Sequence, residues 1–181
     1  AYEYTLPKAI KEGYLSPIKA LTVPLKLDLS QVGVQAGDFK VGEIDTALDP
    51  YLYQIADEMR TYCMNRKTVV FLPLIKTSQK FMRILNEHGF RAAEVNGNSE
   101  DREQVLRDFD EGKYNVLCNS MLLTEGWDCP SVDCVIVLRP TKVRSLYSQM
   151  VGRGTRLYPG KKELLLIDFL WMTERHELCH P

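Results

Sequence analysis

The stretch Tyr-Ser-Gln-Met-Val-Gly-Arg-Gly-Thr-Arg at residues 147–156 follows an apolar strand pattern at residues 135–138. The pattern predicts a helix over residues 144–151 that Gly152 and Gly154 end. Arginine keeps its proton in a protein, and its planar guanidinium suits paired contacts with phosphate oxygens. Arg153 and Arg156 are close enough along the chain to reach one anionic group together. The other interpretation is a solvated basic helix end.

Strand and helix patterns alternate outward from this stretch. Short apolar runs bounded by polar residues predict strands, and the longer segments between them carry apolar residues at helical spacing. Such alternation is typical of a mostly parallel α/β sheet. The expected strands are 68–72, 92–95, 115–118, 132–138 and 163–169, and the expected helices are 50–64, a helix capped by Thr77 or Ser78 that runs to Glu87, and one that begins at Ser99.

Residues 1–48 follow a different pattern from the rest. A short helical pattern ends at Gly13, and apolar residues then alternate over residues 21–29, where Pro24 restricts the predicted strand to the edge of a sheet. The stretch after it is rich in glycine. We therefore expect a connector at 1–48 that docks onto a main domain at 49–181.

Composition limits the possible functions. The 181 residues are 45% hydrophobic, enough for one sizeable core, and 23 basic against 24 acidic residues leave no overall positive charge for nucleic acid. The five cysteines are irregularly spaced, which favours reduced thiols and a cytoplasmic location over disulfides. No apolar run has the roughly 20 residues of a membrane span, and no signal-peptide pattern is present. We expect no membrane partner.

Several motifs, taken in order, resemble those of the superfamily 2 DEAD/DEAH-type helicases. The strand at 68–72 with Pro73 resembles motif IV, the segment 96–112 resembles the family's conserved Gly-Arg-Phe-Gly segment, and 120–136 resembles motif V. The stretch 147–156, with its Gln-x-x-Gly-Arg-x-x-Arg spacing, resembles motif VI. Together they resemble the C-terminal RecA-like domain, over roughly residues 68–169.

The resemblance implies a fold and a nucleotide site. The fold would be a RecA-like three-layer sandwich, with a mostly parallel central sheet, helices on both faces and an N-terminal connector. ATP would lie between this domain and an N-terminal RecA-like domain of the same protein. Arg153 and Arg156 would be arginine fingers and Gln149 would help to align the site. Gly126, Asp128 and Gly152 would meet the nucleotide, with Asp128 an acceptor for a ribose hydroxyl.

The resemblance also implies a nucleic-acid site. Ser120 would contact a backbone phosphate, as would the loop that follows Leu72. We also favour Arg139, Thr141 and Arg144, because we expect them to flank the same strand end as motif VI. The motif V variant and the segment 4–15 are closer to restriction-enzyme and repair-type translocases, which favours DNA and leaves RNA open. The candidate nucleic-acid residues are Ser120, Pro73, Lys76, Arg139, Thr141 and Arg144.

Two motifs of a complete motor are absent from the sequence. There is no G-x-x-x-x-G-K-[ST] phosphate loop, and residues 154–162 have the wrong spacing and no Ser or Thr for magnesium. There is also no Asp-Glu pair of the D-E-x-[HD] type. We expect the Mg²⁺ site to lie in a preceding motor domain and this chain alone not to hydrolyse ATP. The His-Glu-x-x-His spacing at 176–180 lacks a third ligand, so we expect no metal here.

A second hypothesis is a degenerate motor domain that only binds nucleic acid or protein. A pure binding module has no need of arginine fingers, which favours the motor. A third, a self-contained α/β hydrolase, lacks a nucleophile elbow.

Overall fold

The computed structural model describes residues 6–23, 25, 32–120 and 128–170. Its centre is a six-stranded sheet in the order β1-β8-β7-β4-β6-β5, and every neighbouring pair is parallel. The six strands are β1 (Ile18–Thr22), β4 (Thr68–Phe71), β5 (Ala92–Val95), β6 (Val116–Asn119), β7 (Cys134–Val137) and β8 (Leu164–Asp168). A small antiparallel hairpin pairs β2 (Val34–Gln35) with β3 (Asp38–Phe39).

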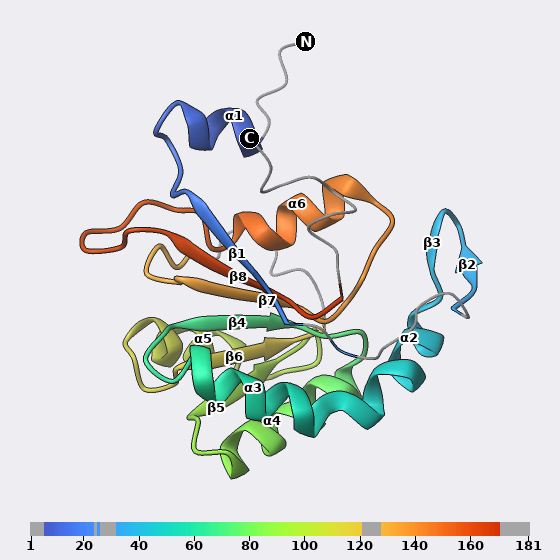
Figure 1. Cartoon of the computed structure of the whole chain (residues 1–181). Helices are drawn as coiled ribbons and strands as arrows, with labels where there is room; N and C mark the ends of the chain where they lie inside the picture. The colour runs from blue at the N-terminus through green and yellow to red at the C-terminus, as the bar shows by residue number, and fades with distance from the viewer. Residues whose placement is uncertain (1–5, 24, 26–31, 121–127, 171–181) are drawn as a thin grey trace.

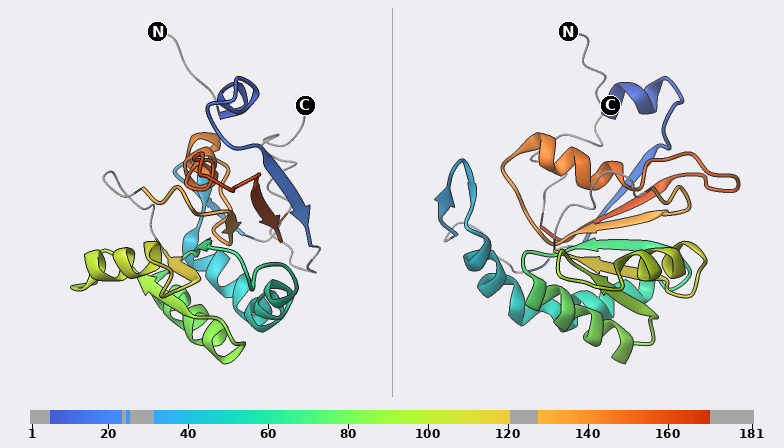
Figure 2. Two further views of the ribbon diagram at one scale, coloured as in Figure 1. Left: turned by 90° about the vertical axis from the view of Figure 1, so that its left-hand side faces the viewer. Right: turned by 180° about the vertical axis from the view of Figure 1, so that it is seen from behind.

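Helices cover both faces of the sheet (Figures 1 and 2). Parallel neighbours require crossover connections, and right-handed crossovers in opposite directions along the sheet place their helices on opposite faces. α3 and α4 therefore lie on one face and α5 and α6 on the other. The helices are α1 (Leu6–Lys11), α2 (Val41–Leu48), the 3₁₀ turn η1 (Asp49–Tyr51), α3 (Leu52–Tyr62), α4 (Ile75–Glu87), α5 (Arg102–Asp110) and α6 (Arg144–Gly152). The predicted RecA-like α/β sandwich is confirmed.

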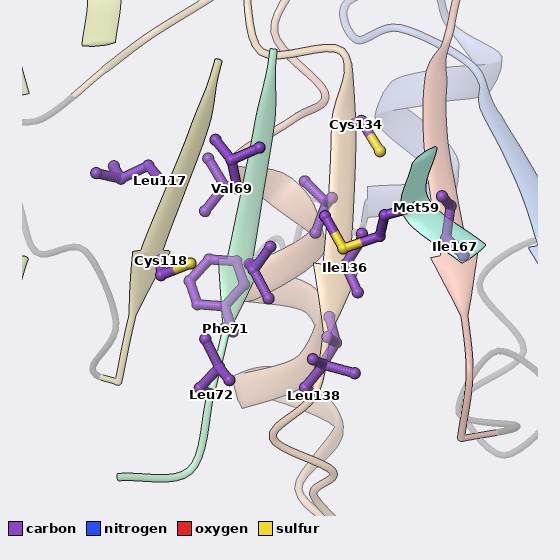
Figure 3. Packing of buried hydrophobic residues seen from close by; sticks show 14 of the residues in the cluster. Met59, Val69, Phe71, Leu72, Leu117, Cys118, Cys134, Ile136, Leu138 and Ile167 are labelled. Carbon is purple, nitrogen blue, oxygen red and sulfur yellow. The ribbon is translucent and has the colours of Figure 1, made fainter. Parts of the chain in front are cut away.

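The central strands are buried on both faces, which explains their nearly continuous apolar sequence. All residues of β4, β6, β7 and β8 are buried. On one face, α4 contributes Phe81, Ile84 and Leu85 at helical spacing. Figure 3 shows side chains of neighbouring strands packed around Phe71 and Ile136. One core therefore holds both edges of the sheet in fixed positions.

A glycine sets the closeness of α6 to the sheet. A Cβ on Gly154 would lie 2.8 Å from Val135 Cγ2, and closer still to Leu164 Cδ1. Both of those side chains are fully buried. The segment after α6 can therefore turn back against the sheet only because residue 154 has no side chain, and this fixes where Arg153 and Arg156 lie.

The N-terminal part completes the sheet. β1 pairs with β8 at the edge of the sheet over residues 18–22, and it shares only Leu21 and Thr22 with the strand predicted at 21–29. Residues 24 and 26–31 lie outside the described part. Leu48 at the end of α2 is fully buried in the same core as Leu52, so residues on both sides of the expected boundary at 48/49 share one core.

Two predicted helix starts are wrong. α4 begins at Ile75 after an extended Leu74, with no side-chain cap, and Thr77 and Ser78 lie buried inside the helix. α5 begins at Arg102, because Ser99 belongs to the preceding turn, where its Oγ accepts a hydrogen bond from the Asn96 N–H at 3.0 Å.

Candidate functional site

The first candidate site is an open cavity of about 330 Å³ lined by Asp128, Cys129, Gly152, Arg153 and Arg156. Arg153 is the C-cap residue of α6, and Arg156 follows in the segment that leads back to the sheet. Arg156 Nη2 lies 3.3 Å from Asp128 Oδ2, and both side chains are more than half exposed, at 57% and 53%. Residues assigned to motifs V and VI thus meet at one cavity.

This cavity lies at the amino edge of the sheet. α6 is a crossover, so it starts beyond the carboxyl end of β7 and ends near the amino end of β8. Figure 1 shows hairpin β2–β3 on the right, where α6 begins, and the segment between α6 and β8 on the left. The expectation that Arg139, Thr141 and Arg144 flank the same strand end as motif VI is therefore wrong: they lie at the opposite, carboxyl edge.

The segment that follows Asp128 is held to its neighbours by side chains. Lys67 Nζ donates to the carbonyl oxygen of Asp110 at 2.7 Å and to Ser131 Oγ at 2.9 Å. Cys129 Sγ lies 3.2 Å from Asp110 Oδ1, and burial raises the pKa of this thiol. Cys129 is therefore a protonated, packed thiol at neutral pH, which is a structural role within the cavity wall.

The second candidate site lies at the carboxyl edge, where β6 and β7 end on either side of β4. Arg139 Nη1 donates to the carbonyl oxygen of Ser120 at 3.1 Å, so the two predicted nucleic-acid residues are in contact. Pro73 is buried just after β4. Lys76 is 76% exposed at the start of α4, with its Nζ 3.4 Å from Asp45 Oδ2. Arg144 is exposed at the first residue of α6.

Thr141 does not fit the role predicted for it, because its side chain is not at the surface. Its side chain is fully buried, and its hydroxyl donates to Asp38 Oδ2 at 2.5 Å. The Lys142 N–H donates to Asp38 Oδ1 at 2.8 Å. Burial alone would raise the pKa of Asp38, but hydrogen bonds from Thr141, Lys142 and Phe39 hold it below its usual value. Thr141 thus anchors hairpin β2–β3 and is not presented to a nucleic-acid strand.

Two predicted features lie outside the described residues, and two others lie on the exposed side of α6. Gly126 and the His-Glu-x-x-His segment at 176–180 lie outside the described residues. Gln149 is exposed on α6, and a Cβ on Gly152 would meet nothing within 4 Å. Within residues 6–23, 25, 32–120 and 128–170, no group of three or more His, Cys, Asp or Glu side chains could hold a metal ion. The same part of the chain has no helix that is long and apolar enough to cross a membrane.

Three residues important to this geometry were not singled out from the sequence: Ser16, Asp38 and Lys161. Ser16 and Lys161 bind the backbone of the segment that carries Arg156. In the sequence, Lys161 belongs only to the segment 154–162, which lacks the spacing and the Ser or Thr of a phosphate loop. Ser16 and Asp38 act on residues more than 100 positions away, which no local spacing could have identified. Lys161 acts on carbonyl groups five and seven residues before it, but only because the chain reverses at Gly160.

Comparison with known proteins agrees with this arrangement. The family described as the helicase conserved C-terminal domain matches residues 52–158, from the start of α3 to just beyond Arg156. The chain belongs to this family. The match spans both edges of the sheet, including the cavity with Arg153 and Arg156, and so confirms the resemblance to superfamily 2 helicases.

Individual relatives extend the match to the connector. A Saccharomyces cerevisiae protein assigned as the ATP-dependent helicase IRC3 is 28% identical over 93% of this chain and 26% of its own length. A Schizosaccharomyces pombe protein assigned as the mitochondrial ATP-dependent helicase irc3 is 37% identical over 88% of this chain and 27% of its own length. A structure described as a fragment of an HsdR subunit of a type I restriction enzyme from Vibrio vulnificus YJ016 superposes with a TM-score of 0.78. It is 27% identical, and the match covers 97% of this chain and 36% of that one. The chain therefore spans only about a quarter to just over a third of these proteins.

Proposed function

We propose that this chain is the C-terminal motor domain of an ATP-dependent nucleic-acid helicase or translocase. In the full-length protein its amino edge would face an N-terminal RecA-like domain, with ATP between the two. The observation that carries the proposal is the meeting of Asp128, Arg153 and Arg156 at one open cavity. They place two guanidinium groups and one carboxylate where an ATP molecule bound between two domains would meet this one.

The residues at the cavity fit part of an ATP site. Guanidinium groups suit a γ-phosphate, and a carboxylate suits a ribose hydroxyl. Arg153 and Arg156 would act as arginine fingers, Gln149 would help to align them, and Asp128, with Gly152 and Gly126, would meet the nucleotide. ATP, when bound, supplies the phosphoryl group that is transferred to water. The sequence has neither a G-x-x-x-x-G-K-[ST] phosphate loop nor a D-E-x-[HD] pair, so Mg²⁺ would be held by the other domain and this chain alone would not hydrolyse ATP.

Arg156 can be available to a phosphate although it contacts Asp128. Both side chains are more than half exposed, and ion pairs of this kind contribute only about 0–1 kcal/mol in water. A phosphate carries more negative charge and can accept paired hydrogen bonds from the guanidinium, and this contact strengthens when a second domain excludes water. Arg156 would thus exchange Asp128 for phosphate, which frees the Asp128 carboxylate for the sugar.

The carboxyl edge would hold the nucleic-acid strand. Ser120 and Arg139 contact each other there, and the loop after Leu72, Lys76 and Arg144 lie along the same edge. Contacts of this kind position a strand without reading its sequence. DNA is favoured because one match that includes the connector is to an HsdR subunit of a restriction enzyme. ATP-dependent RNA helicases match at 26–27% identity, so RNA stays the alternative. The cytoplasmic location stays a prediction, since one relative is named mitochondrial.

The test is steady-state ATPase activity of the full-length protein without nucleic acid, with single-stranded DNA, with duplex DNA and with RNA. We expect stimulation by DNA that the Arg139→Ala and Arg144→Ala variants reduce through a higher DNA concentration for half-stimulation. Lys162→Ala, an exposed residue at the amino edge, serves as the control. ATP turnover that no nucleic acid stimulates, or no turnover at all, would favour the binding-module hypothesis; stimulation by RNA alone would overturn the assignment to DNA.

A further inference from the structure

The backbone around Arg156 is held by a residue of the connector. Ser16 is 1% exposed, and its N–H donates to the carbonyl oxygen of Thr155 at 2.7 Å. Its Oγ donates to the carbonyl oxygen of Arg156 at 3.1 Å. A residue that lies 140 positions away in the sequence thus binds the peptide groups on both sides of the Arg156 Cα.

Lys161 holds the same backbone from the other side. A turn with Gly160 at φ +83° reverses the chain, and the Lys161 N–H closes it by donating to the carbonyl oxygen of Tyr158 at 3.0 Å. The returning Lys161 Nζ donates to the carbonyl oxygens of Gly154 at 2.6 Å and Arg156 at 2.7 Å. The Arg156 carbonyl oxygen therefore accepts from both Ser16 and Lys161.

Lys161 also reaches the segment that follows Asp128. Its Nζ donates to the carbonyl oxygen of Pro130 at 3.2 Å. One ammonium thus joins the backbone two residues after Asp128 to the backbone of Arg156 itself. Hydrogen bonds from an ionised donor are stronger than neutral ones, whereas the exposed Arg156–Asp128 ion pair is weak. The relative placement of the two functional side chains therefore depends on these backbone contacts rather than on their own ion pair.

We propose that Ser16 and Lys161, together the Arg156 clasp, are positioning residues that fix the Arg156 guanidinium for ATP hydrolysis. The proposal rests on the proposed function and deepens it. Neither residue needs to touch the nucleotide. A finger on a loosened segment would still be charged, but displacement of a catalytic group by about 1 Å can reduce turnover by about 10²-fold.

Holding the charged Lys161 ammonium in a half-buried place is unfavourable for the fold. Burial lowers the pKa of Lys161 to about 8, against the opposing influence of Asp133 and Cys129. A fully exposed lysine would keep its ordinary pKa. Lys161 instead is half-buried, and its ammonium bridges the carbonyl groups of Pro130, Gly154 and Arg156. This is the arrangement expected of a lysine that orders backbone.

The test compares Lys161→Met and Ser16→Ala with Lys162→Met, the adjacent exposed lysine, in the full-length protein with saturating DNA. We expect Lys161→Met to lower kcat by roughly 10- to 100-fold with the KM for ATP little changed. Ser16→Ala, which removes one neutral hydrogen bond, should lower kcat by roughly 2- to 10-fold. Lys161→Arg, which keeps the charge, should restore most of the turnover. The thermal midpoints of all variants are measured in parallel.

A kcat for Lys161→Met equal to that of Lys162→Met would overturn the clasp. A parallel loss of kcat and thermal midpoint that Lys161→Arg does not restore would overturn it too, since that pattern indicates a purely structural lysine. Arg156→Ala separates the two proposals. If Arg156→Ala abolishes turnover while Lys161→Met does not, the clasp fails and the proposed function stands. If Arg156→Ala has no effect on turnover, the finger role is wrong, and the clasp, which rests on it, is wrong as well.

Discussion

Gly154 provides the sharpest test of how the fold places the arginines. Replacing it by alanine adds a Cβ that would lie 2.8 Å from Val135 Cγ2 and closer still to Leu164 Cδ1. Because both neighbours are fully buried, neither can move aside without disturbing the core. Overpacking of this kind costs about 1–3 kcal/mol.

Gly152 supplies a matched control only two residues away. A Cβ there would meet nothing within 4 Å, and the residue is the last of α6 with no positive φ. Gly152→Ala should therefore raise the free energy of unfolding by about 0.4–1 kcal/mol, because alanine restricts the unfolded chain. The same substitution at two nearby glycines should thus have effects of opposite sign.

Urea unfolding of the 181-residue chain, followed by circular dichroism, measures both variants. Gly154→Ala should move the unfolding midpoint to lower urea with an unchanged m-value, and should lower the thermal midpoint by about 2–4 °C for each kcal/mol. A Gly154→Ala variant as stable as wild type would refute the argument. So would equal losses at both positions, which would indicate a general requirement for flexible glycine rather than a close approach of α6 to the sheet.

Further predictions concern three sets of titratable groups: Asp38, Lys161 and two buried cysteines. Asp38→Ala should destabilise the chain at neutral pH. Because the folded-state pKa of Asp38 is lowered, the contribution of its charge is full above about pH 3.8, and the difference from wild type in thermal midpoint should shrink as the pH falls from there through the lower folded-state pKa. The turnover of the full-length protein should fall as the pH rises through about 8, where Lys161 loses its proton, and Lys161→Arg should remove that fall; nearby Cys129 and Asp133 are unchanged in the variant and so cannot explain a difference. Over the same range up to about pH 10.5 the unfolded state binds the Lys161 proton more tightly, so the contribution of Lys161 to stability should rise, as urea midpoints against Lys161→Arg would show. Cys118 and Cys134, buried and with raised pKa values, should react with iodoacetamide only after urea is added; modification of either in the native chain, detected by mass spectrometry, would contradict the packing.

The sheet was predictable because its signal is local. Parallel strands buried on both faces have continuous apolar sequence, as in β4 and β8, and the helices that connect successive strands carry apolar residues at helical spacing. The predicted β5 agrees with the structure at both ends. Helix starts were less predictable, because Ser99 and Thr77 satisfy cap preferences but bind elsewhere: Ser99 to the Asn96 N–H and Thr77 to the buried Asp45.

The placement of the candidate sites was predicted only in part. The family resemblance implied that Asp128 and Arg156 meet the same nucleotide, and the two side chains do lie 3.3 Å apart. It did not show that α6 carries its two ends to opposite edges of the sheet. That separation depends on the crossover, which is a property of the whole fold. The burial of Thr141 depends on Asp38, and the anchoring of Arg156 depends on Ser16. Both partners lie in the connector, more than 100 residues away in sequence.

The most direct test of the central claim is single-turnover ATP hydrolysis by the full-length protein with Arg156→Ala, at saturating DNA, together with the affinity for ATP. A finger acts on charge that develops in the transition state, so hydrolysis should fall by about 10³-fold or more while ATP affinity changes by only a few-fold. Hydrolysis at the wild-type rate by a folded variant would contradict the account.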